Sequence, residues 1–424
     1  MGAGNIAQVR GRRVWDSRGR PTVEVEVTLE GGAMGRAIAP AGASTGTGEA
    51  LDLRDGGPAF GGLDVRRAVA NVEAEIAPLL RGRDAQDQAG IDRALIALDG
   101  TPNRARLGGN AMIATSMAVL HAGAAFRHLP LWRHLAGEGR VTIPLPEIQI
   151  FGGGAHAARR VDVQDFMVVC PGAASFAEAL DMTAEVYRAA GGILKARGRA
   201  QGVADEGGHW PAFDSNEEAL GTLTAAIEGA GFTPGSQVAI SLDVAASQFG
   251  AGGRYRLALE NRELDSEGMI GLLATWLASY PILAVEDPLA EDDPEGFRAF
   301  TAAYGDRVQI IGDDFLVTSA DRVARAAASR ACNAVLIKPN QAGTVTETKV
   351  ALDRAKADGF GAIVSARSGE TEDVTIAHLA VGWSAGQLKV GSFTRSERMA
   401  KWNEVLRIEE ALGAEAILAQ PFRR

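Results

Sequence analysis

The chain has 424 residues, a formal net charge of −10 and 46% hydrophobic residues, a composition ordinary for a globular protein and a length sufficient for two domains. The acidic balance, without any run of Lys or Arg, argues against nucleic-acid binding, and the sequence has no run of about 18 apolar residues that would predict a membrane span. Because both cysteines lie inside apolar runs and no secretory leader is evident, we expect buried free thiols in a cytoplasmic protein.

The first part of the chain changes from strand to helix patterning. Residues 5–38 alternate between polar and apolar side chains, which predicts an antiparallel three-stranded meander with one exposed face. Residues 63–136 instead place apolar side chains at helical spacing. We therefore predict an α+β unit over residues 1–136.

From residue 137 onward, strand-like and helix-like segments alternate. Clear helices are predicted over 176–198 and 215–231, the second opening with a Ser-x-x-Glu capping box at Ser215. Five apolar runs typical of buried strands each end at a charged side chain: Asp243, Glu286, Asp313, Lys338 and Arg367. The alternation predicts a parallel (β/α) barrel over residues 137–424, with the chemistry at the carboxyl ends of the strands. Any one of these charges could simply solvate a strand end, but five in succession are more than a core requires.

Three of these strand ends carry carboxylates, Asp243, Glu286 and Asp313. An all-oxygen donor set, with no converging His or Cys, suits Mg²⁺ rather than Zn²⁺. A bound cation would also offset the mutual repulsion of the three charges. The adjacent Asp287 and Asp314 are expected to point away, either behind the ligands or into solvent.

Lys338 and Glu206 are the candidate base and acid. An amine held close to a divalent cation has its ammonium form disfavoured, so Lys338 could remove a proton α to a carboxylate and generate an enediolate. The alternative is that Lys338 only pairs with the carboxylates. Glu206 lies in an Asp-Glu-Gly-Gly loop and could assist the loss of a β-hydroxyl, although such a loop is commonly a surface turn.

Several features suit an anionic ligand. The glycine-rich residues 39–50 offer backbone N–H groups and the hydroxyl of Ser44 to a phosphate. Arg367 and Ser368 add a fork of donors and a hydroxyl, and Lys389 adds a point charge for a carboxylate. Each feature alone is more often structural. Together with the predicted metal ligands they indicate a small, doubly anionic substrate.

Two of the six histidines are candidates for the same site. His156 lies in a Gly-rich loop after a predicted barrel strand. His209 follows the Glu206 loop and either reaches the substrate or packs that loop. The other four lie in helix-like segments and are expected to be surface or packing residues: His121, His128, His134 and His378.

Over nearly its whole length the sequence is similar to the enolase family, the phosphopyruvate hydratases. The similarity runs in order through VWDSRGRPTVEVEV, GASTG, LDGTPNRARLGGNA, GGAHA, ADEGG, LDVAAS, EDPLAEDD, GDD, IKPNQAGTVTET, RSGETED and GSFTRSER. It implies a fold in which an α+β capping domain (1–136) sits on a modified (β/α)8 barrel (137–424) whose first units break the simple alternation. It also implies a Mg²⁺-dependent lyase that reversibly dehydrates 2-phosphoglycerate to phosphoenolpyruvate through an enediolate.

The resemblance also implies roles for individual residues. The implied Mg²⁺ ligands are Asp243, Glu286 and Asp313, with Ser44 joining a second Mg²⁺ to the substrate phosphate. The implied catalytic residues are Lys338 as base, Glu206 as acid, His156 and Asp165. The implied substrate-binding residues are Ser44, Gln164, Arg367, Ser368 and Lys389. A homodimer or larger homo-oligomer is expected, because Arg18 and Glu409 fall in segments that resemble the family's dimer interface.

Some positions depart from the family pattern on the side of the leaving group and the phosphate. Ala366 replaces a His, Asp165 replaces a Glu, Gly152 replaces an Asn, Pro339 replaces a Leu and His209 replaces a Phe. The predicted metal ligands and Lys338 are unchanged. An alternative is therefore an enolase paralogue that forms an enediolate from a different small phospho or phosphono acid. A non-catalytic binding protein would give no reason for Lys338 and Glu206 to be kept.

Overall fold

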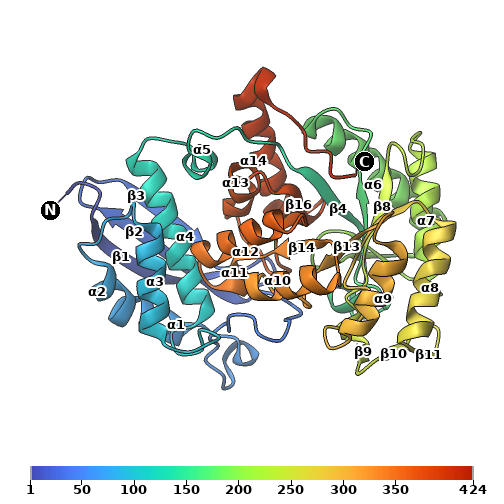
Figure 1. Cartoon of the computed structure of the whole chain (residues 1–424), viewed down its shortest axis with the longest axis horizontal. Coiled ribbons are helices and arrows are strands. Elements are labelled where there is room, and N and C mark those ends of the chain that lie inside the picture. The colour runs from blue at the N-terminus through green and yellow to red at the C-terminus, as the bar shows by residue number, and fades with distance from the viewer. Residues whose placement is uncertain (1, 423–424) are drawn as a thin grey trace.

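The computed structural model describes residues 2–422, and Figure 1 shows an N-terminal sheet with its helices beside a C-terminal barrel. The N-terminal sheet has the antiparallel order β1 (Ile6–Trp15), β2 (Pro21–Leu29) and β3 (Met34–Ile38), as the polar–apolar alternation predicts. The helices that follow are η1 (Ala59–Gly62), α1 (Arg66–Asn71), a π-helical turn η2 (Val72–Ile76), α2 (Ala77–Leu80), α3 (Gln88–Asp99), α4 (Gly109–Phe126) and α5 (Leu131–Ala136).

Helix α4 packs directly against the N-terminal sheet. Almost every side chain of α4 from Gly109 to Ala124 is buried, so this helix is apolar on all sides. At Gly35 in β3, an added Cβ would lie 2.2 Å from the carbonyl oxygen of Ala118, so only glycine permits this approach. The chain runs from β3 straight into residues 39–50, and the Ile38 N–H donates to Asp373 of the barrel at 2.8 Å. The sheet thereby fixes where this loop starts.

Eight strands close the barrel. In spatial order they are β4 (Leu145–Gly152), β5 (Asp165–Val169), β8 (Ala239–Asp243), β12 (Ile282–Glu286), β13 (Gln309–Gly312), β14 (Ala334–Ile337), β15 (Gly361–Ser365) and β16 (Gly386–Ser392), and β16 pairs with β4. The five strands predicted from their apolar runs are β8 and β12 to β15.

One feature of a simple parallel barrel is wrong for this chain, because β5 runs antiparallel to both β4 and β8. A parallel neighbour requires a crossover connection, usually a helix. Residues 153–164 between β4 and β5 contain only the 3₁₀ turn η3 (Gly154–Ala157), so the chain reverses direction there. The family resemblance, which implies irregular first units, is confirmed.

Helices surround the barrel in the order α6 (Phe176–Ala196), α7 (Asn216–Gly229), α8 (Ser266–Ser279), α9 (Pro294–Tyr304), α10 (Ala320–Ser329), α11 (Pro339–Ala342), α12 (Val345–Ala357), α13 (Thr375–Gly382) and α14 (Ser396–Leu412). Short elements complete the chain: β6 (Ala200–Val203), β7 (His209–Pro211), η4 (Ala246–Gln248), β9 (Gly250–Ala251), β10 (Arg254–Leu257), β11 (Arg262–Asp265) and η5 (Gly413–Glu415). Ser215 caps α7 by accepting from the Glu218 N–H at 3.0 Å, while the Glu218 carboxylate accepts from Asp214 rather than from Ser215.

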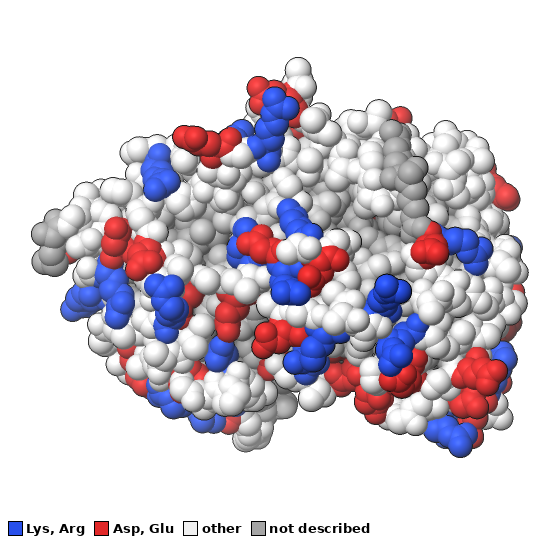
Figure 2. All heavy atoms as spheres, in the orientation of Figure 1, with Lys and Arg blue, Asp and Glu red and all other residues white. Residues whose placement is uncertain are grey.

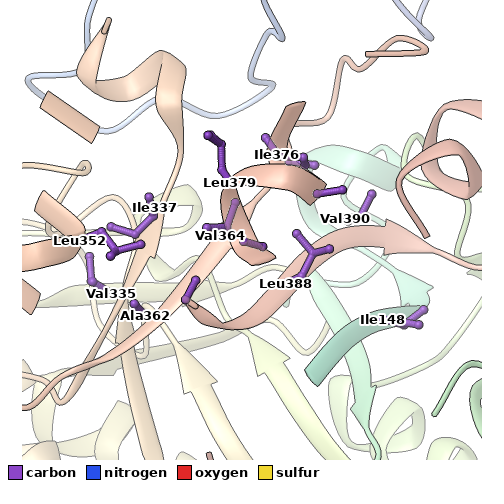
Figure 3. Close-up of a cluster of buried hydrophobic side chains, with 14 of the residues drawn as sticks. Ile148, Val335, Ile337, Leu352, Ala362, Val364, Ile376, Leu379, Leu388 and Val390 are labelled. Atoms are coloured by element: carbon purple, nitrogen blue, oxygen red, sulfur yellow. The ribbon is translucent and has the colours of Figure 1, made fainter. Parts of the chain in front are cut away.

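The core between the barrel strands and the outer helices is apolar. Figure 3 shows Val335, Val364 and Leu388 from three neighbouring strands beside Leu352 and Leu379 from the covering helices. All five side chains are fully buried, so the strands cannot slide without opening this layer. The ends of β14, β15 and β16, which carry or adjoin candidate site residues, are therefore rigidly placed.

No helix within residues 2–422 has the length and hydrophobicity needed to cross a membrane. On the face in Figure 2, acidic and basic side chains are interspersed across the described surface. Both cysteines are buried free thiols, as their apolar surroundings predict.

Candidate active site

The candidate residues from both parts of the chain meet in one pocket at the carboxyl ends of the barrel strands. Those lining it are Ser44, His156, Gln164, Asp165, Glu206, Asp243, Lys338, Arg367, Ser368 and Lys389. Glu286 and Asp313 lie behind Lys389 and Lys338, which bond to them. The pocket encloses only about 20 Å³ of free space, room for about one water molecule, so a larger ligand can enter only if the covering loop moves.

Asp243 and Glu286 are neighbours because their strands pair in register. The Lys389 Nζ lies 2.8 Å from Asp243 Oδ2 and 2.7 Å from Glu286 Oε2. Burial, followed by the charge of Asp243, raises the pKa of Glu286 well above its usual range. Glu286 Oε1 is buried and has no hydrogen-bond partner among residues 2–422. The unpartnered oxygen and the repulsion between the Asp243 and Glu286 carboxylates together indicate a position that additional positive charge would stabilise.

Lys338 forms an ion pair with Asp313 Oδ2, at the ends of neighbouring strands. Burial works to lower the pKa of Lys338, but the charges of Asp313 and Glu286 work against it, and the pKa is raised. Burial likewise works to raise the pKa of Asp313, yet the charge and hydrogen bond of Lys338 lower it. The ion pair thus favours the charged form of both side chains.

His156, Asp165 and Glu206 lie close together in the lining of the pocket. His156 Nδ1 lies 3.2 Å from Asp165 Oδ1, and its Nε2 lies 3.0 Å from Ser368 Oγ and 3.7 Å from Glu206 Oε1. Burial works to lower the pKa of His156, but the charges of Glu206 and Asp165 raise it. Despite its burial, Asp165 has its pKa lowered to about 2 by the charge of His156. The Asp165 carboxylate thus faces His156.

The 39–50 loop covers the pocket and contacts the candidate anion-binding residues. The Arg367 guanidinium donates to the Ser44 carbonyl at 2.8 Å and to Glu49 Oε2 at 2.9 Å. The Ala43 N–H donates to Ser368 Oγ at 3.2 Å. Gln164 lies beside the carboxylates and donates to Asp243 Oδ2 at 2.7 Å. In this closed arrangement the Glu49 carboxylate and the Ser44 carbonyl both hold the Arg367 guanidinium.

His209 does not line the pocket; of the two alternatives left by the sequence, the structure shows loop packing. Its ring stacks on Tyr187 with ring centroids 4.1 Å apart, and its Nε2 lies 3.1 Å from the Tyr187 carbonyl oxygen. A Cβ added at Gly191 would lie 2.8 Å from the ring, so glycine makes room for the imidazole on α6.

Two further departures from the family pattern have a local packing explanation. A Cβ at Gly152 would lie only 2.5 Å from the Cβ of Ala204. The absence of a side chain at Gly152 thus makes room for the one at Ala204. Pro339 opens α11, a position where its missing N–H costs no helical hydrogen bond.

Of the two alternatives for Asp287 and Asp314, the structure shows the position behind the proposed ligands rather than in solvent. Both are buried, and the Asp287 carboxylate accepts the backbone N–H groups of Asp313 and Asp314 at 3.0 and 2.8 Å. Asp287 therefore holds the turn that presents Asp313. Burial, followed by the charge of Asp314, raises the pKa of Asp287 well above its usual range.

Sequence reasoning missed three polar residues of this region, Glu49, Gln341 and Glu147. Glu49 ends the glycine-rich loop, and Gln341 follows Lys338 by three positions, so their proximity to recognised motifs was the available signal. Glu147 is a lone charge in the apolar strand β4, fully buried and bonded to Ser241. A carboxylate within a buried strand was the signal there.

Arg18 and Glu409, expected near a subunit interface, each have partners within the chain. The Arg18 guanidinium donates to the Ala41 carbonyl at 2.9 Å, at the start of the 39–50 loop. The Glu409 carboxylate accepts from the N–H groups of Phe176 and Ala177 at 2.7 and 3.0 Å and so caps α6.

Comparison with known proteins covers almost the whole chain. The family models described as the N-terminal domain of enolase and the C-terminal TIM barrel domain of enolase match residues 6–135 and 140–421. The chain is 50% identical over 414 residues to Enolase 1 of Desulfitobacterium hafniense, covering 97% of this chain and 95% of that protein. It is 49% identical over 413 residues to an enolase of Rubrobacter xylanophilus, covering 97% of this chain and 96% of that one.

Proposed function

The chain belongs to the enolase family, and from its active site we propose how it carries out the reversible dehydration of 2-phosphoglycerate to phosphoenolpyruvate. It is a carbon–oxygen hydro-lyase. The observation that carries the proposal is the convergence of three buried strand-end carboxylates with Lys338 at the mouth of the barrel. The ends of the two family matches support a boundary between the capping domain and the barrel at residues 136 and 137.

A divalent cation fits the carboxylates Asp243, Glu286 and Asp313. The donors are all oxygen, the Glu286 Oε1 atom has no hydrogen-bond partner within residues 2–422, and the mutual repulsion calls for positive charge. We infer Mg²⁺ at these ligands and a second Mg²⁺ at Ser44 when the substrate phosphate is present. When bound, the metal stabilises the negative charge that develops on the substrate carboxylate.

Lys338 is the proposed base, and its task is to take the proton from carbon 2 of the substrate. The amine and the Glu206 carboxylate both line the pocket that the substrate would fill. Its partner Asp313 holds it in place through the ion pair. Proton removal needs the neutral amine. A cation that competes for the Asp313 carboxylate would weaken the ion pair and so favour the neutral form of Lys338.

Glu206 and His156 are the proposed groups on the leaving side. Protonation of the hydroxyl at carbon 3 lets it depart as water while the enediolate electrons form the new double bond. Glu206 Oε1 lies 3.7 Å from His156 Nε2, so the two groups are close enough for their charges to interact. Asp165 fixes the imidazole from its other nitrogen, which keeps Nε2 directed into the pocket.

The substrate's two anionic groups have separate partners. Arg367, Ser368 and Ser44 are proposed to bind the phosphate, and Lys389 the carboxylate, with Gln164 beside it. The 39–50 loop must open to admit the substrate and can close again over it. We also propose a cytoplasmic, glycolytic enzyme that forms a homodimer or larger homo-oligomer.

One observation favours an enolase paralogue: Ala366 and Asp165, two departures from the family pattern, both line the pocket, and Asp165 is turned to His156. A different small phospho or phosphono acid that also forms an enediolate would use the same metal carboxylates and Lys338.

The deciding experiment is phosphoenolpyruvate formation from 2-phosphoglycerate with Mg²⁺, followed by ultraviolet absorbance beside a known enolase. We expect turnover within about tenfold of that enolase, lost on chelation and restored by Mg²⁺. Turnover lower by about 10³-fold, equivalent to about 4 kcal/mol of lost transition-state stabilisation, in a folded protein that binds Mg²⁺ would favour the other acid as substrate.

A further inference from the structure

Gln341 links the 39–50 loop to the proposed metal site through its side-chain amide. The residue is 2% exposed and lies in α11, three positions after Lys338. Its Nε2 donates to Asp313 Oδ1 at 2.9 Å and to Glu49 Oε1 at 3.2 Å. One amide nitrogen therefore joins a proposed metal ligand to a carboxylate of the covering loop.

The orientation of this amide is fixed on its other side. Gln341 Oε1 accepts from Thr318 Oγ1 at 2.6 Å, and Thr318 Oγ1 in turn accepts from the backbone N–H of Lys338 at 2.9 Å. If the amide were rotated by half a turn, its oxygen would face two carboxylates. Every polar atom of the Gln341 side chain is thus satisfied in one orientation only.

Glu49 extends the link to the proposed phosphate site. Its carboxylate accepts from Arg367 Nη1 at 2.9 Å and from the Gly46 N–H at 2.9 Å. The next residue of the loop, Ala50, donates its N–H to the Gln341 carbonyl at 2.8 Å. Gln341 consequently holds the end of the loop through its backbone carbonyl, and it holds Glu49 through its side-chain amide.

We propose that Gln341 is a positioning residue that couples closure of the 39–50 loop to the geometry of Asp313, so that phosphate binding at Arg367 and cation binding at Asp313 reinforce each other. The inference rests on the proposed function, in which Asp313 is a metal ligand and Arg367 binds the phosphate. The chain of contacts is continuous from Arg367 through Glu49 and Gln341 to Asp313 and Lys338. Groups that orient metal ligands in this way typically contribute 10- to 100-fold in affinity or activity.

The test compares Gln341→Leu with Gln309→Leu in the full chain. Leucine removes the amide at similar volume in both, but Gln309 lies at the opposite end of β13 from Asp313 and bonds only to Gln387 there. Calorimetry measures Mg²⁺ affinity with and without 2-phosphoglycolate, a phosphorylated carboxylate that has no hydroxyl to lose. Hydrogen exchange measures protection of the Gly46 and Ala50 amides in the same samples.

In the wild type and in Gln309→Leu we expect Mg²⁺ and 2-phosphoglycolate to tighten each other's binding and to protect both amides. In Gln341→Leu the factor by which each ligand increases the affinity for the other should fall by about 10-fold. The Gly46 and Ala50 amides should also exchange faster with both ligands present. Unchanged coupling in Gln341→Leu, or an equal loss in Gln309→Leu, would overturn the inference.

A second variant, Glu49→Gln, tests the same link without altering the barrel. Its effect on the coupling should not add to that of Gln341→Leu, since both break one chain of contacts. Additive losses of the coupling between the two ligands would contradict the inference. If Gln341→Leu folds poorly, Glu49→Gln alone should still weaken that coupling, and unchanged coupling in Glu49→Gln would overturn the inference. Failure of the proposed function looks different, because the wild type would then form no phosphoenolpyruvate, whatever Gln341 does.

Discussion

The two walls of the active site are built in different ways. The wall proposed to remove the proton comes from β8, β12, β13 and β14, which are parallel neighbours that each deliver a side chain at or just after the strand end. The wall proposed to release the hydroxyl comes from the antiparallel β4–β5 pair and from the loops around His156 and Glu206. Two of the departures from the family pattern, Gly152 and Asp165, lie in this second wall, and His209 in β7 pairs with β4 behind it, whereas Ala366 lines the pocket from the end of the parallel strand β15. The predicted metal ligands and Lys338 thus lie on a regular barrel edge, while most of the departures lie in or beside the irregular β4–β5 region.

The largest effect is expected from Lys338→Ala. Without the amine, exchange of the carbon-2 proton with solvent should fall by about 10³-fold or more, because the proposed base is removed. Proton exchange is measured by NMR in ²H₂O, and Mg²⁺ binding should remain. Lys356→Ala is a matched control, since Lys356 bonds only to the Trp383 carbonyl on the outside of the barrel. Exchange that persists in Lys338→Ala would remove Lys338 as the base.

Asp165→Asn should impair the wall proposed to release the hydroxyl without impairing the wall proposed to remove the proton. Loss of the charge that fixes His156 is expected to lower phosphoenolpyruvate formation by about 10²-fold while Mg²⁺ binding is kept. Asp162→Asn removes another buried carboxylate, from the loop just before β5, that bonds to Ala258 and Asn216 outside the pocket, and it should leave turnover unchanged. Equal turnover losses in both variants would mean that Asp165 acts only through loop stability.

Gly152→Asn tests whether a family departure is packing rather than chemistry. The new Cβ would meet the Cβ of Ala204 at 2.5 Å, so we expect a loss of about 1–3 kcal/mol in the free energy of unfolding. The double variant Gly152→Asn, Ala204→Gly should regain most of that stability in urea titrations. If the double variant were as unstable as the single one, the two positions would not compensate each other.

The smallest effect is expected from Ala366→His. A second imidazole in the pocket adds a proton donor, and we expect turnover of 2-phosphoglycerate to rise about three- to tenfold. Steady-state assays at saturating Mg²⁺ measure this turnover. No gain, or a loss, would indicate a pocket that is already adapted to another substrate.

The difference between the walls also explains what the sequence could predict. Asp243, Glu286, Asp313 and Lys338 follow apolar runs, and a strand pattern predicts where its end lies. The runs alone did not predict the antiparallel course of β5, and the family resemblance implied only that the first units of the barrel are irregular. Contacts such as Gln341 with Glu49 join residues 292 positions apart, and no local pattern specifies them. Pairwise packing, as between Gly152 and Ala204, likewise becomes visible only in three dimensions.

The most direct test of the account follows both half-reactions in one ²H₂O sample of 2-phosphoglycerate, for the wild type and for Asp165→Asn. Loss of the carbon-2 proton signal reports the first wall, and the appearance of phosphoenolpyruvate reports the second. We predict that in Asp165→Asn the proton still exchanges at a rate within a few-fold of the wild type while phosphoenolpyruvate formation falls by about 10²-fold. If exchange and elimination fell together, the two walls would not act independently and the central claim would be wrong.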